Sequence, residues 1–189
     1  MKEQLKLFRE ERIRRLLILF SLPKALSTDI SKIKKEVFNR MGPYIYYDST
    51  PHITICKLQV TDSRMPKIID NLTNCLSRFS SFNIELSGFS TFAESLTFYA
   101  EIGNPETFKP ILNEIKLFKC SEGLSDSLSI TDIPHATIGR FRSSYELGQL
   151  WSEYNNKGYR SEGILECVKV LEWEGMGYSH VNTIKLRSC

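Results

Sequence analysis

Apolar positions along the chain change repeatedly between strand-like and helix-like spacing. A continuous apolar run, "RLLILFSLP" at 15–23, predicts a buried strand that ends at a proline. Residues 28–42 then place apolar side chains three and four positions apart, which predicts a helix capped by Thr28 and ended by Gly42. The alternating "PHITI" at 51–55 predicts the next strand.

The order strand, helix, strand, helix, strand occurs twice. The remaining predicted elements are a helix from 65 to 79, strands at 82–89 and 96–102, a helix at 104–118, a strand at "PHATI", a helix at 143–154, and strands at 163–173 and 180–186. Corresponding elements lie about 80 residues apart, which indicates two pseudo-symmetric lobes. We expect one bilobal domain over residues 1–189, with a charged N-terminal arm or helix at 1–14 and an irregular segment at 119–133.

The two copies share a P-H-x-T-I motif, although the chain has only three histidines. Residues two apart on a strand point the same way, so His52 shares a face with Thr54, and His135 with Thr137. If the lobes meet about a twofold axis, two imidazoles and two hydroxyls converge on one cleft. Such a set suits a phosphodiester: one imidazole accepts a proton, the other donates one, and the hydroxyls bind the phosphate oxygens. An old duplication that kept the pattern for packing is the alternative.

The composition limits the classes of protein to which this chain can belong. A net charge of +3 permits an anionic ligand but is weak for a protein that coats duplex nucleic acid. Five cysteines without C-x-x-C spacing predict free thiols and a cytoplasmic location. We expect no metal ion and no cofactor, because no ligand cluster has metal-binding spacing. No apolar run is long enough to span a membrane, so we expect no membrane partner.

The paired motifs "HITI" and "HATI" resemble those of the 2H phosphoesterase superfamily, and within it the bacterial 2′-5′ RNA ligase-like proteins. "RLLILFSLP", "GFSTFAESLTFYAEI" and "PHATIGRF" are similar to other family segments, so the resemblance covers about residues 14–187. It implies an α+β fold of two pseudo-symmetric lobes, each a mostly antiparallel sheet with helices outside, around a central cleft. It also implies His52 and His135 as acid and base, and Thr54 and Thr137 as phosphate binders.

Three further residues are candidates for binding substrate. The resemblance implies Arg140, although strict alternation from His135 would turn Arg140 to the other face unless a β-bulge intervenes. Lys57 is the counterpart of Arg140 in the first copy and meets the same objection, so it is left out. Phe92 and Tyr178 could stack on a base, with packing or surface positions as the alternative.

The leading functional hypothesis is a metal-independent phosphodiesterase. By resemblance it would act on a 2′,3′-cyclic phosphate or a 2′-5′ linked nucleotide or RNA end, as a monomer. Two alternatives stay open: the ligase direction on RNA ends, which would use the same catalytic residues, and a nucleotide-binding regulatory module with the same cleft.

Overall fold

The computed structural model describes residues 11–188. The predicted N-terminal arm lies mostly outside the described residues, and its last two positions, Ile13 and Arg14, already belong to the first strand. In chain order the elements are β1 (Ile13–Ser21), α1 (Lys24–Met41), β2 (His52–Thr61), α2 (Met65–Leu76), β3 (Phe82–Phe92), β4 (Thr97–Ile102), the short 3-10 helix η2 (Pro105–Phe108), α3 (Lys109–Ser121), β5 (Leu128–Ile130), β6 (His135–Arg140), α4 (Ser144–Tyr154), β7 (Arg160–Leu165), β8 (Cys167–Trp173) and β9 (Tyr178–Lys185).

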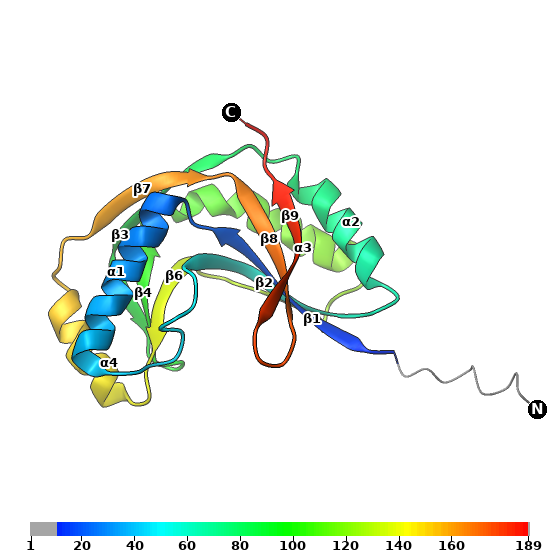
Figure 1. Cartoon of the computed structure of the whole chain (residues 1–189). Helices are drawn as coiled ribbons and strands as arrows, with labels where there is room; N and C mark the ends of the chain where they lie inside the picture. The colour runs from blue at the N-terminus through cyan, green and yellow to red at the C-terminus, as the bar shows by residue number, and fades with distance from the viewer. Residues whose placement is uncertain (1–10, 189) are drawn as a thin grey trace, which may run out of the picture.

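The strands of residues 11–188 form one curved nine-stranded sheet (Figure 1). Eight strands follow the order β7-β3-β4-β6-β2-β1-β8-β9, and β5 pairs with β2 off this path. Each pairing between named strands is antiparallel. The predicted α+β class with an antiparallel sheet is therefore confirmed.

The helices cover one face of the sheet and leave the other open. Alternate β1 residues Leu16, Ile18 and Phe20 join the buried stripes of α1 to α4 in one hydrophobic core. Their neighbours Leu17 and Leu19 are buried but lie outside that core, on the opposite face. Figure 1 shows α1 and α4 at one end of the sheet and α2 and α3 at the other. The open face is therefore the surface on which a ligand can lie.

The two sequence copies exchange strands to build the lobes. β1 pairs with β2 of its own copy and with β8 of the second copy, and β8 pairs with β9, whereas β3 of the first copy pairs with β4 and β7 of the second. Helix α1 follows the same exchange, since it contacts β6 and β7. Each lobe is therefore built from both copies, and neither copy buries its own apolar face alone.

Local predictions fail where tertiary contacts compete. The predicted strand at 163–173 is two strands, β7 and β8, which lie in different lobes. Helix α1 begins at Lys24, directly after Pro23, and not at Thr28. The Asn104 side chain caps no helix, because its Oδ1 accepts a hydrogen bond from the backbone N–H of Glu85 at 2.9 Å. The predicted helix at 143–154 does begin with a side-chain cap, because Ser143 Oγ accepts a hydrogen bond from the Glu146 N–H at 3.2 Å.

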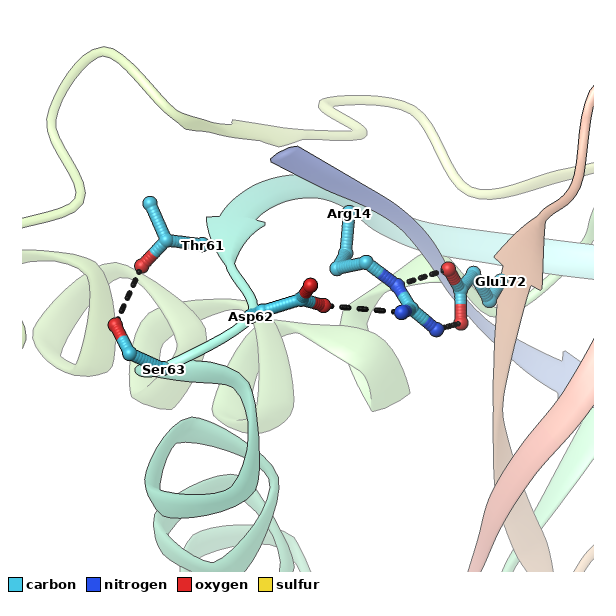
Figure 2. Close-up of polar contacts among 5 residues, drawn as sticks. All are labelled: Arg14, Thr61, Asp62, Ser63 and Glu172. Carbon is cyan, nitrogen blue, oxygen red and sulfur yellow. Dashed lines mark hydrogen bonds and ion pairs between the residues drawn. The ribbon is translucent and has the colours of Figure 1, made fainter. Parts of the chain in front are cut away.

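An ion pair lies near the start of β1, on the face of the sheet that the helices cover (Figure 2). Glu172 of β8 is 4% exposed and lies opposite Leu16, so its carboxylate would be buried without a partner. The Arg14 guanidinium donates to both of its oxygens through Nε and Nη2. Arg14 Nη1 also donates to Asp62 Oδ1 at 2.9 Å, beyond the end of β2. Arg14 thus joins β1 to β8 and to the residue that follows β2.

Unfolding experiments can test how much the Arg14–Glu172 ion pair stabilises the protein. Arg14→Met should destabilise the protein by about 3 kcal/mol, because it leaves the buried Glu172 carboxylate without its counter-charge. The double variant Arg14→Met/Glu172→Leu should recover most of that loss, since no charge is left buried. Urea denaturation measures both. Equal stability of the single and double variants would show that the pair does not neutralise a buried charge.

Candidate active site

The two motifs meet at a single residue pair. Ile53 of β2 and Ala136 of β6 are antiparallel partners, and this is the one position at which these strands pair. Antiparallel register then sets His52 opposite Thr137, and Thr54 opposite His135. Ile53 and Ala136 are fully buried in the core, so the four motif side chains point to the open face. We call this junction the β2–β6 seam.

The two imidazoles come from opposite strands of the seam. His52 and His135 are diagonal neighbours across it, a relation that in antiparallel sheets separates residues by about 7–8 Å. All four side chains are half-buried. The sequence prediction that two imidazoles and two hydroxyls share one face is met by the register.

Both imidazoles are oriented in the same way. Nδ1 of His52 lies 2.8 Å from the carbonyl oxygen of Thr50, and Nδ1 of His135 lies 2.7 Å from that of Ile133. A carbonyl can only accept, so Nδ1 carries the proton in each ring. In the neutral ring Nε2 then carries the free lone pair. Nε2 is therefore the atom that takes up a proton, and the imidazolium form can release that proton again.

Burial lowers the pKa of both histidines from the ordinary value of about 6.5. For His135, burial is the one cause that lowers the pKa, and the hydrogen bond to Ile133 opposes it. For His52, the charges of Lys34, His135 and Lys57 lower the pKa further. The positive charges of Lys34 and Lys57 thus disfavour the protonated form of His52 and are not among the causes that act on His135.

A β-bulge inside each motif turns the following basic residue onto the open face. Leu19 pairs with Thr54 and Ile18 with Cys56, so Ile55 is an extra residue on β2, and Lys57 is then opposite Leu17. Ile138 is the extra residue on β6 in the same way, because Tyr99 pairs with Thr137 and Phe98 with Gly139.

The second bulge settles the side on which Arg140 lies. Arg140 is opposite Thr97, which lies two residues from Tyr99 on the open face. The expectation from strict alternation is wrong for both basic residues. The face argument that excludes Lys57 therefore does not hold. The sequence carries a signal for both residues, because a basic residue follows each histidine by five positions, in "HITICK" and "HATIGR".

Gly139 is required where the bulge meets the core. A Cβ at this position would overlap the Tyr44 ring, which stacks on Phe141 at 5.1 Å between centroids. The small residue lets the loop that precedes the first motif pack against the second motif.

Aromatic rings form a wall beside His135. Phe92 stacks on Tyr99 with centroids 4.3 Å apart, and both rings lie 4.9 Å from the His135 imidazole. Phe92 is half-buried and therefore keeps a surface for a ligand. The structure thus brings Phe92 to the motif, whereas Tyr99, which is only 5% exposed, was missed because it reads as an ordinary core position.

The loop at 42–51 holds His52 and is itself held by the other lobe. The buried Lys34 ammonium of α1 donates to the carbonyl oxygens of Tyr46 and Ser49, at 2.9 and 2.7 Å, and to Ser49 Oγ at 2.9 Å. Burial lowers the pKa of Lys34 to about 8. Ile45 and Arg140 exchange two backbone hydrogen bonds, at 3.1 and 3.0 Å. The first motif's loop is thus joined directly to the end of the second motif.

Tyr178 lies farther from the seam than Phe92. It is 50% exposed at the start of β9 and contacts the Trp173 ring at 5.1 Å. Together with Lys57 and Tyr46 it lines a groove of about 1050 Å³. The third histidine, His180, makes a 2.8 Å contact between Nε2 and Thr183 Oγ1 on the same strand.

Residues 11–188 contain no group of three or more His, Cys, Asp or Glu side chains placed to hold one metal ion. None of the described helices is both long and apolar enough to cross a membrane.

Comparison with solved structures supports the fold. E. coli LigT complexed with 3′-AMP has a TM-score of 0.70 at 16% identity and covers 93% of this chain and 99% of its own. TT0787 of Thermus thermophilus has a TM-score of 0.67 at 17% identity, with 92% and 98% covered. Kluyveromyces marxianus Usb1 has a TM-score of 0.55 at 12% identity, with 93% and 99% covered. At these identities the likeness shows a shared fold.

Comparison with sequences adds the family to the shared fold. No curated protein matches this chain. The family model described as the 2'-5' RNA ligase superfamily matches residues 22–176, a range that contains both motifs, both bulges and the loop at 42–51. This chain therefore belongs to the 2'-5' RNA ligase superfamily of 2H phosphoesterases.

Proposed function

We propose that this protein is a phosphodiesterase that opens a 2′,3′-cyclic phosphate or cleaves a 2′-5′ linkage at the end of a nucleotide or RNA chain. The observation that carries the proposal is the seam: one residue pair sets two histidines with free Nε2 atoms around the same open space. E. coli LigT has been solved with 3′-AMP, ATP and NADP+, and those ligands support a nucleotide as the substrate here.

His52 is the proposed base and His135 the proposed acid. Positive charges near His52 favour its neutral form, so its Nε2 accepts the proton of the attacking water. His135 keeps the proton of the pair and donates it from Nε2 to the departing ribose oxygen. The new P–O bond comes from water, the P–O bond to the ribose oxygen breaks, and the proton taken by His52 balances the one given by His135.

The negative charge of the phosphate is met by four side chains. The Thr54 and Thr137 hydroxyls donate to its non-bridging oxygens, each opposite the histidine of the other motif. Lys57 and Arg140 bring positive charge to the same face through the two bulges. Arg140 can also hold two phosphate oxygens at once with its planar guanidinium.

The Phe92 ring is the proposed platform for the base of the reacting nucleotide. It lies edge to face with His135 and is backed by the Tyr99 ring. Stacking tolerates any base, because every base has a π face. Phe92→Leu should therefore weaken binding of the nucleotide more than it changes the chemistry of the bound phosphate.

Replacing the motif residues tests the assignment. His52→Ala and His135→Ala should each lower kcat by about 10²–10⁴-fold, as expected for a general acid or base. Thr54→Ala and Thr137→Ala should each cost about 1–3 kcal/mol of transition-state stabilisation, and the Thr→Ser variants less, because the hydroxyl remains. Melting temperatures should change little. Lower melting temperatures with normal turnover would instead support the packing explanation of the motifs.

The pH dependence of kcat/KM should be bell-shaped with its maximum below about pH 6.5. Activity rises as His52 loses its proton and falls as His135 loses its own, and burial lowers both pKa values below their ordinary range. The two apparent values belong to the pair if the imidazoles interact. Initial rates at low substrate from pH 4 to 9 measure the profile. A maximum above pH 7.5 would contradict the assignment.

Lys34 is a positioning residue whose charge also acts on His52. Lys34→Met should move the acidic limb of the kcat/KM profile to higher pH, because removing the ammonium removes one cause of the low His52 pKa. Lys34→Arg keeps the charge and should leave that limb in place. The pH profiles of the two variants provide the measurement. An acidic limb that stays at its wild-type pH in Lys34→Met would limit Lys34 to holding the loop.

A further inference from the structure

A groove is lined by Lys57 of β2, by Tyr178 of the edge strand β9 and by residues between them. Its volume is about 1050 Å³, at the upper end of the roughly 300–1,000 Å³ typical of pockets for a single small ligand. The walls are the segment that contains β5, at 125–132, and residues of α3, β1, β2, β8, β9 and the loop at 42–51. Neither motif histidine lines it, so the groove is an addition to the site described above.

Positive charge predominates in this groove. Its lining contains four basic side chains, Arg15, Lys57, Lys116 and Lys119, and two acidic ones, Asp126 and Asp132. None of the four basic residues forms an ion pair with residues 11–188. Their charges are therefore available to an external anion, and their spread over β1, β2 and α3 suits several phosphates better than one.

Aromatic rings stand beside these charges. Trp173 and Tyr178 contact each other at 5.1 Å, and both line the groove with Tyr46. Tyr46 is 47% exposed and Tyr178 is 50% exposed, so each offers an uncovered surface. Tyr46 has φ +72, a conformation that is costly for a residue with a Cβ, and the Lys34 ammonium holds its carbonyl oxygen. An exposed ring held in a strained backbone is a feature typical of binding sites.

Lys57 connects the groove to the reacting centre. It lines the groove, it lies on the same face of β2 as His52 and Thr54, and its charge is close enough to lower the His52 pKa. A chain whose terminal phosphate lies at the seam can therefore continue along the groove. Cations and rings that line one groove fit a single strand, in which unpaired bases stack on aromatic side chains while the backbone follows basic ones.

We propose that this groove binds the single-stranded RNA that leads to the reacting phosphate, so that the preferred substrate is an oligonucleotide several nucleotides long. The proposal rests on the proposed function and assigns the groove's residues a role in substrate length. A base-paired end would hide its bases from Trp173, Tyr46 and Tyr178, so it is expected to bind weakly.

The test compares two substrates with the same reactive end: a 2′,3′-cyclic mononucleotide and a six-nucleotide RNA that ends in that nucleotide. The wild type should show a kcat/KM at least about tenfold higher for the hexamer, since stacking of one or more bases contributes that much. Lys116→Gln/Lys119→Gln should lose most of this preference and keep its rate on the mononucleotide. Lys24→Gln/Lys35→Gln, which removes two exposed charges from α1, is the matched control and should keep both rates.

A binding measurement separates the groove from the chemistry. Fluorescence anisotropy with a hexamer that ends in a 3′-phosphate needs no turnover, so it reports on the groove even if the wild type cleaves neither substrate. The Lys116→Gln/Lys119→Gln variant should reduce the slope of log K against log salt by about 1.4, because each phosphate contact to a single strand contributes about 0.7. Trp173→Ala should weaken binding about tenfold or more.

Three results would overturn the groove proposal. The first is that Lys116→Gln/Lys119→Gln loses the same share of its rate on both substrates. The second is that neither this variant nor Trp173→Ala weakens binding of the hexamer. The third is that a hexamer annealed to its complement binds as tightly as the single-stranded hexamer. If the wild type cleaves neither substrate but binds the hexamer, and the groove variants weaken that binding, the proposed function is overturned and the groove proposal stands.

Discussion

One antiparallel contact, between Ile53 and Ala136, holds the two halves of the site together. Both residues are fully buried, so the core on the helix side sets the register of the four polar side chains on the other side. A slip of one residue at this contact would turn a histidine and a threonine of one motif into the core. The chemistry of the open face is thus controlled by packing on the covered face.

The surroundings of the seam make the two halves dependent on each other. The loop before His52 pairs with Arg140 of the other motif and is held by Lys34, which belongs to a helix that packs on β6 and β7. Charges from this network and from Lys57 distinguish two imidazoles that are otherwise held alike, each by a carbonyl two residues before it. A nearly symmetric pair can therefore divide the roles of acid and base.

The resemblance carried by the paired motifs implied the antiparallel α+β fold. Local periodicity was sufficient to place His52 with Thr54, and His135 with Thr137, on one face of a strand. It could not predict which strands would pair, so the exchange of strands between lobes and the division of 163–173 into β7 and β8 were missed. Strict alternation also misplaced Arg140 and Lys57, since a bulge depends on the partner strand. Lys34 gave no signal, because a lysine in a helical pattern normally faces solvent.

The central claim is that His52 and His135 face one shared anion with Nε2 free in both rings. Nitrogen-15 NMR of the two imidazoles, titrated with pH in the absence and presence of inorganic phosphate, tests it most directly. We predict Nδ1-protonated neutral rings, pKa values below about 6.5 in the free protein, and an upward shift of both pKa values when phosphate binds, because an anion favours the imidazolium form. Nε2-protonated rings, or a phosphate-dependent shift at one histidine and not the other, would contradict the account.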